Sequence, residues 1–333
     1  MNNSYEEQEM ISSICGFINV EIHFDQQDAL HSIFLCTINV LFAVSAIFLN
    51  CTVIFVIWKT RSLRTPSNMF VLGLAVSDLA VGLIVQPLFV ATIMTGIRGE
   101  FSTYCSLRLT METVALIVLG ASFFTLTIIS VERLLALSLH LRYQAAMTCK
   151  RAVVCVGSIW LLTLVWALCR FWIKMQVFTA VNSLLVYTSL LINTLAYIQI
   201  FRLVKRHKTQ IASQAVNCAT TTSSTRLQLS KYVKTVSTIV TLLIVTIATY
   251  SGWVVVTIAL RLSVGGKNEH HLYAAFTSVT TLVFVTSTFN PVLYCLRLGE
   301  IRAAVKRLFL KQNHREEDRL ARCHHQLVLY SVN

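Results

Sequence analysis

The sequence predicts an all-α membrane protein, a bundle of seven transmembrane helices followed by a short amphipathic helix. Of its 333 residues, 55% are hydrophobic and only 13% are charged, and the mean hydropathy is +0.67. An ordinary soluble domain carries about 25% charged residues. The apolar residues also gather in seven long blocks. These observations exclude a disordered chain and favour a protein that crosses a membrane.

Each block is long enough to span a bilayer. A hydrocarbon core about 30 Å thick needs roughly 20 residues of α-helix. Helices are expected because lipid cannot satisfy exposed backbone groups and the blocks lack the alternation of barrel strands. A soluble core would instead require seven long helices with almost no polar face. The predicted spans are about 32–58, 68–95, 105–139, 152–170, 176–203, 233–261 and 270–296.

The distribution of Lys and Arg predicts the orientation. Segment 1–28 contains no Lys or Arg. The connections 59–64, 140–151, 202–234 and 297–333 carry 21 basic residues, and those on the other side carry 6. Basic residues accumulate in cytoplasmic loops. We therefore expect a multi-pass plasma-membrane protein with an extracellular N-terminal segment (1–28), a transmembrane domain (29–296) and a cytoplasmic tail (297–333). The net charge of +13 indicates contact with anionic lipid, not nucleic acid.

Two features of the predicted outer side concern covalent modification. Asn2 begins an Asn-Asn-Ser triplet, which is a glycosylation acceptor pattern. Of ten cysteines, Cys15, Cys105 and Cys169 lie near this side. At most one extracellular disulfide is expected, and its existence and pairing stay open.

Charged residues inside the predicted spans mark functional positions, because a charge in the bilayer is costly. Asp78 lies in span two, Glu112 in span three, and the adjacent pair Glu132-Arg133 at the inner end of span three. Span seven carries the sequence Asn290-Pro291-Val292-Leu293-Tyr294.

These motifs resemble those of the rhodopsin-like (class A) G-protein-coupled receptors, from residue 29 to about 311. The short outer loop at about 170–175 and the proline-free fifth span are similar to the melanocortin, cannabinoid and adenosine receptor branch. The matching residues are Asn50, Val53, Leu74, Ala75, Asp78, Ser122, Glu132, Arg133, Trp160, Tyr197, Lys234 and the motif at 290–294.

The resemblance implies an allosteric sodium site at Asp78, Ser122 and Asn290, with no other cofactor. The alternative is a hydrogen-bonded polar core that holds no ion. Ser287 and Thr286 are further candidate ligands.

The resemblance also implies an activation switch at the inner end. Release of the Glu132–Arg133 pair would let Arg133 extend toward Tyr197 and Tyr294, which opens a cleft for a heterotrimeric G protein. Leu141 would insert into that G protein. The alternative is a salt bridge at the membrane interface.

The sequence departs from the family at the usual trigger in span six. Ile247 stands where a tryptophan is usual and Thr249 where a kinking proline is usual; Trp253 is a candidate substitute for the tryptophan.

Two types of ligand are excluded by the residues of spans three and seven. Ala115 replaces the aspartate that binds amines, and Phe284 stands where opsins carry the retinal lysine.

The ligand contacts are expected near the outer end of span three. Glu112 would bind a basic ligand or, as in melanocortin receptors, a peptide with calcium; alternatively it pairs with Arg108 at i,i+4. His271 is expected either to line the same mouth, beside Ala115 and Trp253, or simply to be solvated. The ligand itself, a peptide or a small molecule, stays unidentified.

Two cytoplasmic segments complete the prediction. Residues 299–311 alternate apolar and basic positions at helical spacing, as in a helix lying on the inner leaflet. Residues 219–224 are a polar stretch open to phosphorylation, with a receptor kinase and arrestin as partners, or an unmodified linker.

The leading interpretation is a receptor that passes an extracellular signal to a G protein. The alternatives are a seven-span binding or scaffold protein that does not signal and, much less favoured, a transporter, for which no internal repeat is visible. An enzyme is not expected, because no nucleophile–base set or metal-ligand spacing is present.

Overall fold

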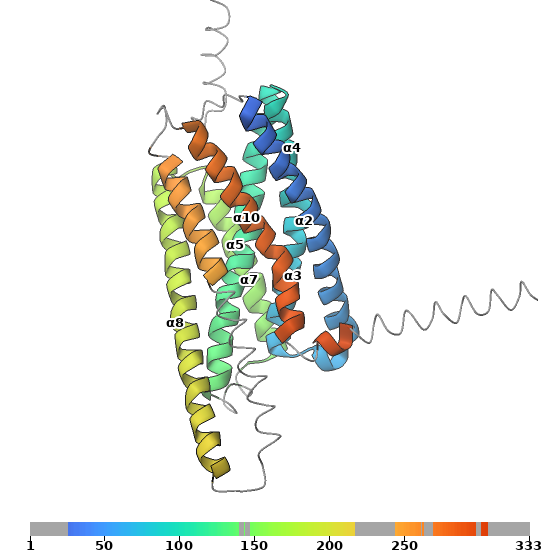
Figure 1. Ribbon diagram of the computed structural model, residues 1–333, viewed down its shortest axis with the longest axis vertical. Helices are drawn as coiled ribbons and strands as arrows, with labels where there is room; N and C mark the ends of the chain where they lie inside the picture. The colour runs from blue at the N-terminus through green and yellow to red at the C-terminus, as the bar shows by residue number, and fades with distance from the viewer. Residues whose placement is uncertain are drawn as a thin grey trace, which may run out of the picture.

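The computed structural model describes residues 26–139, 143, 147–216, 244–260, 262, 269–297 and 301–305, which form a bundle of long helices (Figure 1). No β-strand occurs among them, and the predicted fold class is confirmed. The elements are α2 (Gln26–Lys59), η1 (Arg61–Leu63), α3 (Pro66–Ala80), η2 (Val81–Val85), α4 (Gln86–Ile97), α5 (Phe101–Leu139), α7 (Cys149–Cys169), α8 (Met175–Val216), the helix Ile244–Leu260 and α10 (Glu269–Arg297).

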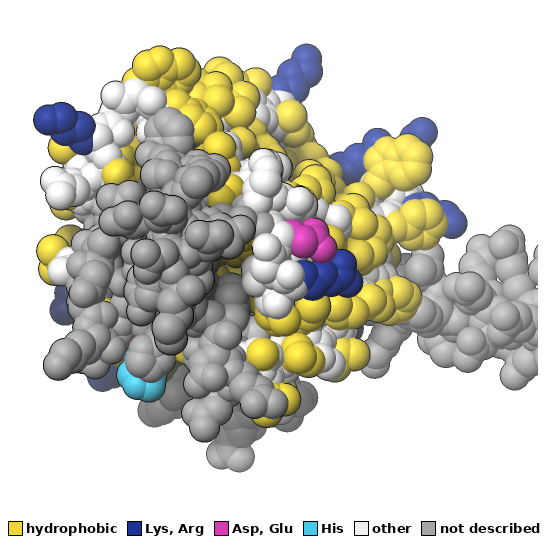
Figure 2. Space-filling model, turned by 90° about the horizontal axis from the view of Figure 1, so that it is seen from above, with side chains coloured by type: hydrophobic (Ala, Val, Ile, Leu, Met, Phe, Trp, Pro, Cys, Tyr) yellow, Lys and Arg dark blue, Asp and Glu magenta, His cyan; other side chains and the backbone are white. Residues whose placement is uncertain are grey.

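Six helical stretches are long and apolar enough to cross a membrane, and the described helix Ile244–Leu260 is a shorter apolar one. Large apolar side chains cover the outside of the bundle, for example Phe34 at 62% and Leu161 at 61% exposed. Figure 2 shows hydrophobic side chains over most of the described surface visible in that view. Such a surface suits lipid and would be a liability in water. Residues 233–243 of the predicted sixth span lie outside the described residues.

The second predicted span is not one regular helix. A π-helical turn, η2, joins α3 to α4, and Pro87 stands in the first turn of α4. Proline has no backbone N–H and displaces the carbonyl four residues earlier, so the helix widens locally instead of breaking. The turn directs Val81 and Val85, both fully buried, into the core.

The helices pack closely at the lower end of Figure 1, where α2 ends. A Cβ added at Gly73 of α3 would lie 2.6 Å from Val156 Cγ1 of α7, so only glycine permits this approach. The short helical segment 301–305 joins the same core: Ile301 is fully buried and Arg302 is exposed. The other residues of the predicted amphipathic helix, 299–300 and 306–311, lie outside the described residues.

Candidate functional site

A cavity opens in the upper half of the bundle, the half in which α2 begins. Its walls come from α5, α8, the helix Ile244–Leu260 and α10. Three of the predicted ligand contacts, Glu112, Ala115 and Trp253, line it, and so does Phe284. His271 is exposed at the start of α10 and is not among the lining residues.

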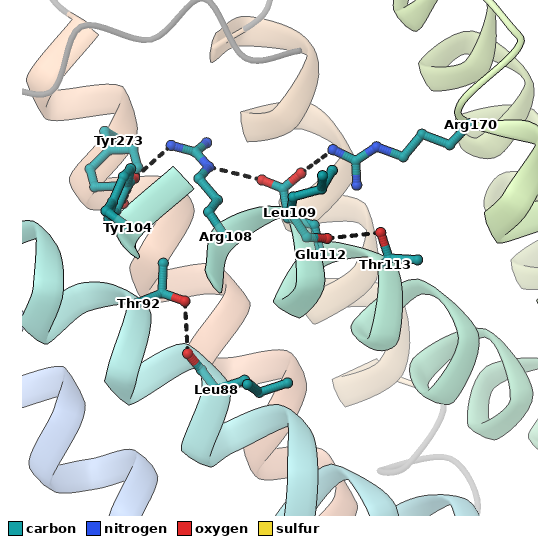
Figure 3. A network of polar contacts seen from close by, with 9 residues as sticks. All are labelled: Leu88, Thr92, Tyr104, Arg108, Leu109, Glu112, Thr113, Arg170 and Tyr273. Atoms are coloured by element: carbon teal, nitrogen blue, oxygen red, sulfur yellow. Dashed lines mark hydrogen bonds and ion pairs between the residues drawn. The ribbon is translucent and has the colours of Figure 1, made fainter. Parts of the chain in front are cut away.

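An ion-pair network stands in the cavity wall (Figure 3). Arg108 Nε lies 3.0 Å from Glu112 Oε1, and Arg170 Nη2 donates to Glu112 Oε2. Arg108 Nη1 also donates to Tyr104 OH at 2.8 Å, and its guanidinium lies 5.7 Å from the ring centroid of Tyr273. The predicted i,i+4 pair is therefore present, and a second arginine from the end of α7 joins it.

This network changes the expected role of Glu112. Each oxygen of its carboxylate already accepts from one arginine, and the Arg108 and Arg170 side chains are both 6% exposed. A basic ligand or a calcium ion at Glu112 would have to displace a buried guanidinium. Arg170 was missed because it lies 58 positions away on another helix, where no local spacing pairs it with Glu112.

A buried polar core lies midway along the bundle. Asp78 Oδ1 accepts from Ser122 Oγ at 2.9 Å, and Asp78 Oδ2 accepts from Asn290 Nδ2 at 2.8 Å. Ser287 is buried beside them, and its carbonyl accepts from Asn50 Nδ2 at 3.3 Å. The structure thus brings together the three residues of the predicted sodium site. The Thr286 hydroxyl bonds to its own helix instead.

A second polar cluster, which sequence reasoning missed, lies closer to the upper end. Asn39 of α2 donates to Thr281 Oγ1 of α10 at 3.0 Å and accepts from Gln86 Nε2 of α4 at 3.3 Å. All three side chains are buried. Because polar groups in an apolar interior need partners, this cluster fixes how three helices meet.

At the lower end of α5, the Glu132 carboxylate is held by three neighbours. Arg133 Nε lies 3.5 Å from Oε2, while Oε1 accepts from Ser67 Oγ and, at 2.6 Å, from Tyr143 OH. Burial raises the pKa of the Tyr143 phenol above its ordinary value, and the bond to Glu132 adds to the rise. Tyr143 therefore remains a protonated donor at physiological pH.

The remaining switch residues are placed as follows. Tyr197 OH accepts from Ser130 Oγ at 3.1 Å, so Tyr197 faces α5 one turn before Arg133. Pro291 and the backbone of Tyr294 belong to α10. Leu141, the side chain of Tyr294 and the glycosylation candidate Asn2 lie outside the described residues.

The structure shows which described cysteines are free and which one forms a disulfide. Cys105 is disulfide-bonded. Cys36, Cys51, Cys149, Cys155 and Cys169 are free, so none of these is its partner. Within the described part of the chain, no group of three His, Cys, Asp or Glu side chains could hold a metal ion.

Comparison with known proteins agrees with this arrangement. Over 116 residues the chain is 35% identical to the adenosine receptor A2a of Cavia porcellus, covering 35% of this chain and 27% of that receptor. It is 32% identical to the adenosine receptor A2b of Rattus norvegicus over 131 residues (39% and 37% of the two chains). It is 29% identical to a dopamine D2-like receptor of Drosophila melanogaster over 114 residues (34% and 12%). The matched stretches thus span a minor part of these relatives.

A family model gives the longer match. The model of the seven-transmembrane receptors of the rhodopsin family matches residues 49–294, which include the polar core, the cavity and the Glu132–Arg133 pair. This chain belongs to the rhodopsin family of seven-transmembrane receptors.

Proposed function

We propose that this chain is a G-protein-coupled receptor of the plasma membrane with its N-terminus outside. An extracellular ligand binds in the cavity, and the opposite end of the bundle activates a heterotrimeric G protein. Family membership supports this proposal, as does the similarity to adenosine and dopamine D2-like receptors. A receptor kinase and arrestin acting on residues 219–224, which lie outside the described residues, would end the signal.

The observation that carries the proposal is that one helix, α5, contains part of every site. Glu112 lies in the cavity wall, Ser122 bonds to Asp78 in the polar core, and Glu132-Arg133 lies in the lower part of the helix. Glu112 and Glu132 are 20 positions apart, which is about 30 Å of α-helix. No proline interrupts α5. A rotation or shift of this one helix therefore moves all three sites together.

The lower end supplies the two states that a ligand must bias. With the Glu132–Arg133 pair closed, as in the structure, the guanidinium stays beside its own helix. Opening the pair frees Arg133 to extend toward Tyr197, whose hydroxyl lies one turn away on Ser130. A ligand activates the receptor only if it binds the open arrangement more tightly than the closed one.

We also propose that the polar core binds a sodium ion in the closed state. Asp78 supplies a buried carboxylate and Ser122 a hydroxyl oxygen beside it, while Asn290, whose Nδ2 donates to Asp78, would have to turn its amide oxygen toward the ion. Small hard cations prefer oxygen ligands. The ion would stabilise the closed arrangement, in which Asp78 of α3, Ser122 of α5 and Asn290 of α10 lie together.

The competing function is a binding protein that no longer signals. It is favoured by the regular helix Ile244–Leu260, in which the Thr249 hydroxyl donates to the Val245 carbonyl where the family has a kinking proline. Under this reading a ligand binds in the cavity but the lower end does not respond.

The test is to express the chain with an N-terminal epitope and measure G-protein dissociation, basally and with peptide, lipid and nucleoside ligands. We expect antibody access without permeabilisation and a G-protein response that Arg133→Ala abolishes. Arg61→Ala, an exposed arginine at the same end, is the control and should keep the response. Equal signalling by Arg133→Ala at equal surface expression would refute the switch. Ligand binding without any G-protein response would establish the competing function.

A further inference from the structure

The charge of the cavity mouth indicates which class of ligand it takes. Arg108 and Arg170 contribute two positive charges and Glu112 one negative charge, and all three line the cavity. The Arg108 and Arg170 side chains are each 6% exposed. The network thus carries a net charge of one positive unit in a largely desolvated place. A buried charge without a counter-charge is costly.

No described side chain supplies the missing negative charge. Apart from Glu112, the acidic residues with described side chains are Asp78, Glu100 and Glu132. Asp78 and Glu132 belong to the polar core and to the lower end, and Glu100 faces Arg98 at the surface, 3.8 Å away. Among the described residues, Arg170 bonds through Nη2 to Glu112, which leaves its Nε and Nη1 as unused donors beside the cavity.

Below the mouth the cavity is apolar and aromatic. Phe123 and Tyr250, whose ring centroids are 4.4 Å apart, form its floor, and Phe276 and Phe284 line it on the α10 side. Thr280 also lines the cavity, and its Oγ1 is buried and has no hydrogen-bond partner. The site therefore offers a cationic rim, a largely apolar and aromatic interior, and an unused hydroxyl on Thr280.

We propose that the cavity binds an amphiphilic monoanion. Its carboxylate accepts hydrogen bonds from the free N–H groups of Arg170 and neutralises the excess positive charge, and its aromatic or alkyl body fills the floor. Arginine is well suited to this role because its planar fork matches a carboxylate. This inference rests on the proposed function only in that it takes the same cavity to be the ligand site.

The test uses three probes that share one body and differ in charge: 4-phenylbutyrate, 4-phenylbutan-1-ol and 4-phenylbutylamine. Apparent dissociation constants come from the rise in melting temperature of the purified full chain with probe concentration. We expect the carboxylate to bind at least about tenfold more tightly than the alcohol, because it makes charge-assisted hydrogen bonds, and the amine to bind most weakly. Equal binding of acid and alcohol, or no binding of any probe to folded protein, overturns the proposal.

Variants separate an anion site from a merely structural network. Arg170→Gln removes the excess charge and should abolish the preference for the carboxylate, whereas Arg170→Lys should retain it. Glu112→Gln raises the net charge of the mouth to two and should tighten carboxylate binding several-fold. Arg98→Gln, an exposed arginine at the same end, is the control and should change nothing. If Glu112→Gln weakens carboxylate binding as much as Arg170→Gln does, the network is only structural and the proposal fails.

The two proposals fail in different ways. Probe binding is measured without a G protein. Tighter binding of the carboxylate than of the alcohol, with no G-protein response, would therefore refute the proposed function alone. A G-protein response that depends on Arg133, combined with equal binding of the acid and the alcohol, would refute the anion site alone.

Discussion

Neutralising Glu132 tests whether the closed pair restrains the receptor. In the structure this carboxylate is 2% exposed and is bound by Arg133, Ser67 and Tyr143. Glu132→Gln keeps the size of the side chain but removes its charge. The closed arrangement loses the ion pair and two charge-assisted hydrogen bonds become neutral ones, whereas the open arrangement, in which these contacts are absent, loses little.

The magnitude follows from the geometry of each contact. Arg133 is 38% exposed and 3.5 Å away, so its pairing contributes about 0.5 kcal/mol. Each of the bonds from Ser67 and Tyr143 weakens by about 1 kcal/mol when its acceptor loses its charge. The closed arrangement is thus destabilised by about 2.5 kcal/mol, which is about sixtyfold in the ratio of open to closed receptor. Tyr143→Phe removes one of these charge-assisted bonds outright, which costs about 1.5 kcal/mol and should give about tenfold.

The assay is ligand-independent G-protein dissociation, normalised to surface expression. We expect the rank Glu132→Gln, then Tyr143→Phe, then the unmodified chain, with Arg61→Gln indistinguishable from the last. Unchanged or lower basal signalling in Glu132→Gln, in a variant that still couples when a ligand is added, would show that the pair does not restrain activation.

Three further predictions concern the ion and the packing. The unmodified chain should melt at a higher temperature in sodium chloride than in equimolar choline chloride, and Asp78→Asn should abolish that difference because it removes the charge that attracts the cation. Gly73→Ala should lower stability by about 1–3 kcal/mol because its Cβ would lie 2.6 Å from Val156, while Gly157→Ala, with open space around it, should stay within about 1 kcal/mol. Asn39→Leu should cost about 1–3 kcal/mol, measured by thermal denaturation, because its buried partners on two other helices lose their bonds.

The fold could be predicted because a membrane span is a local property of sequence. Apolar length alone indicates the helix, and the bilayer supplies the common axis. The π-helical turn before Pro87 could not be predicted in the same way. A proline removes one backbone donor, but a kink, a 3₁₀ turn and a π turn all accommodate it, and the neighbouring helices decide among them.

Side-chain contacts of the site could be predicted where both partners lie on one helix, and could not be predicted where the partners lie on different parts of the chain. Arg108 and Glu112 are four positions apart, so their pairing follows from helical geometry. Arg170 and Tyr143 come from other parts of the chain, and no spacing rule connects them to Glu112 or Glu132. The polar core was anticipated through resemblance to the family, because spacing alone does not bring three spans together.

His271 illustrates how small an offset removes a residue from a site. The α10 residues that line the cavity include Phe276, Thr280 and Val283, spaced by four and three positions along one face. Toward the start of the helix this stripe continues through Tyr273, which contacts Arg108. It does not pass through His271. Two positions along a helix turn a side chain by about 200°, so His271 points away from the stripe.

Because the sixth span lacks the usual tryptophan and proline, we propose that another pair of rings acts as the trigger. Tyr250 packs on Phe123 at the cavity floor, and Phe123 directly follows Ser122, which bonds to Asp78. A ligand that reaches the floor therefore presses on a residue next to the polar core without needing a bend in the helix Ile244–Leu260. The cationic rim and the floor then have separate tasks. Under the two proposals, the head group would govern affinity because it neutralises a buried charge, and the apolar body would govern activation because only it would contact the rings above the polar core.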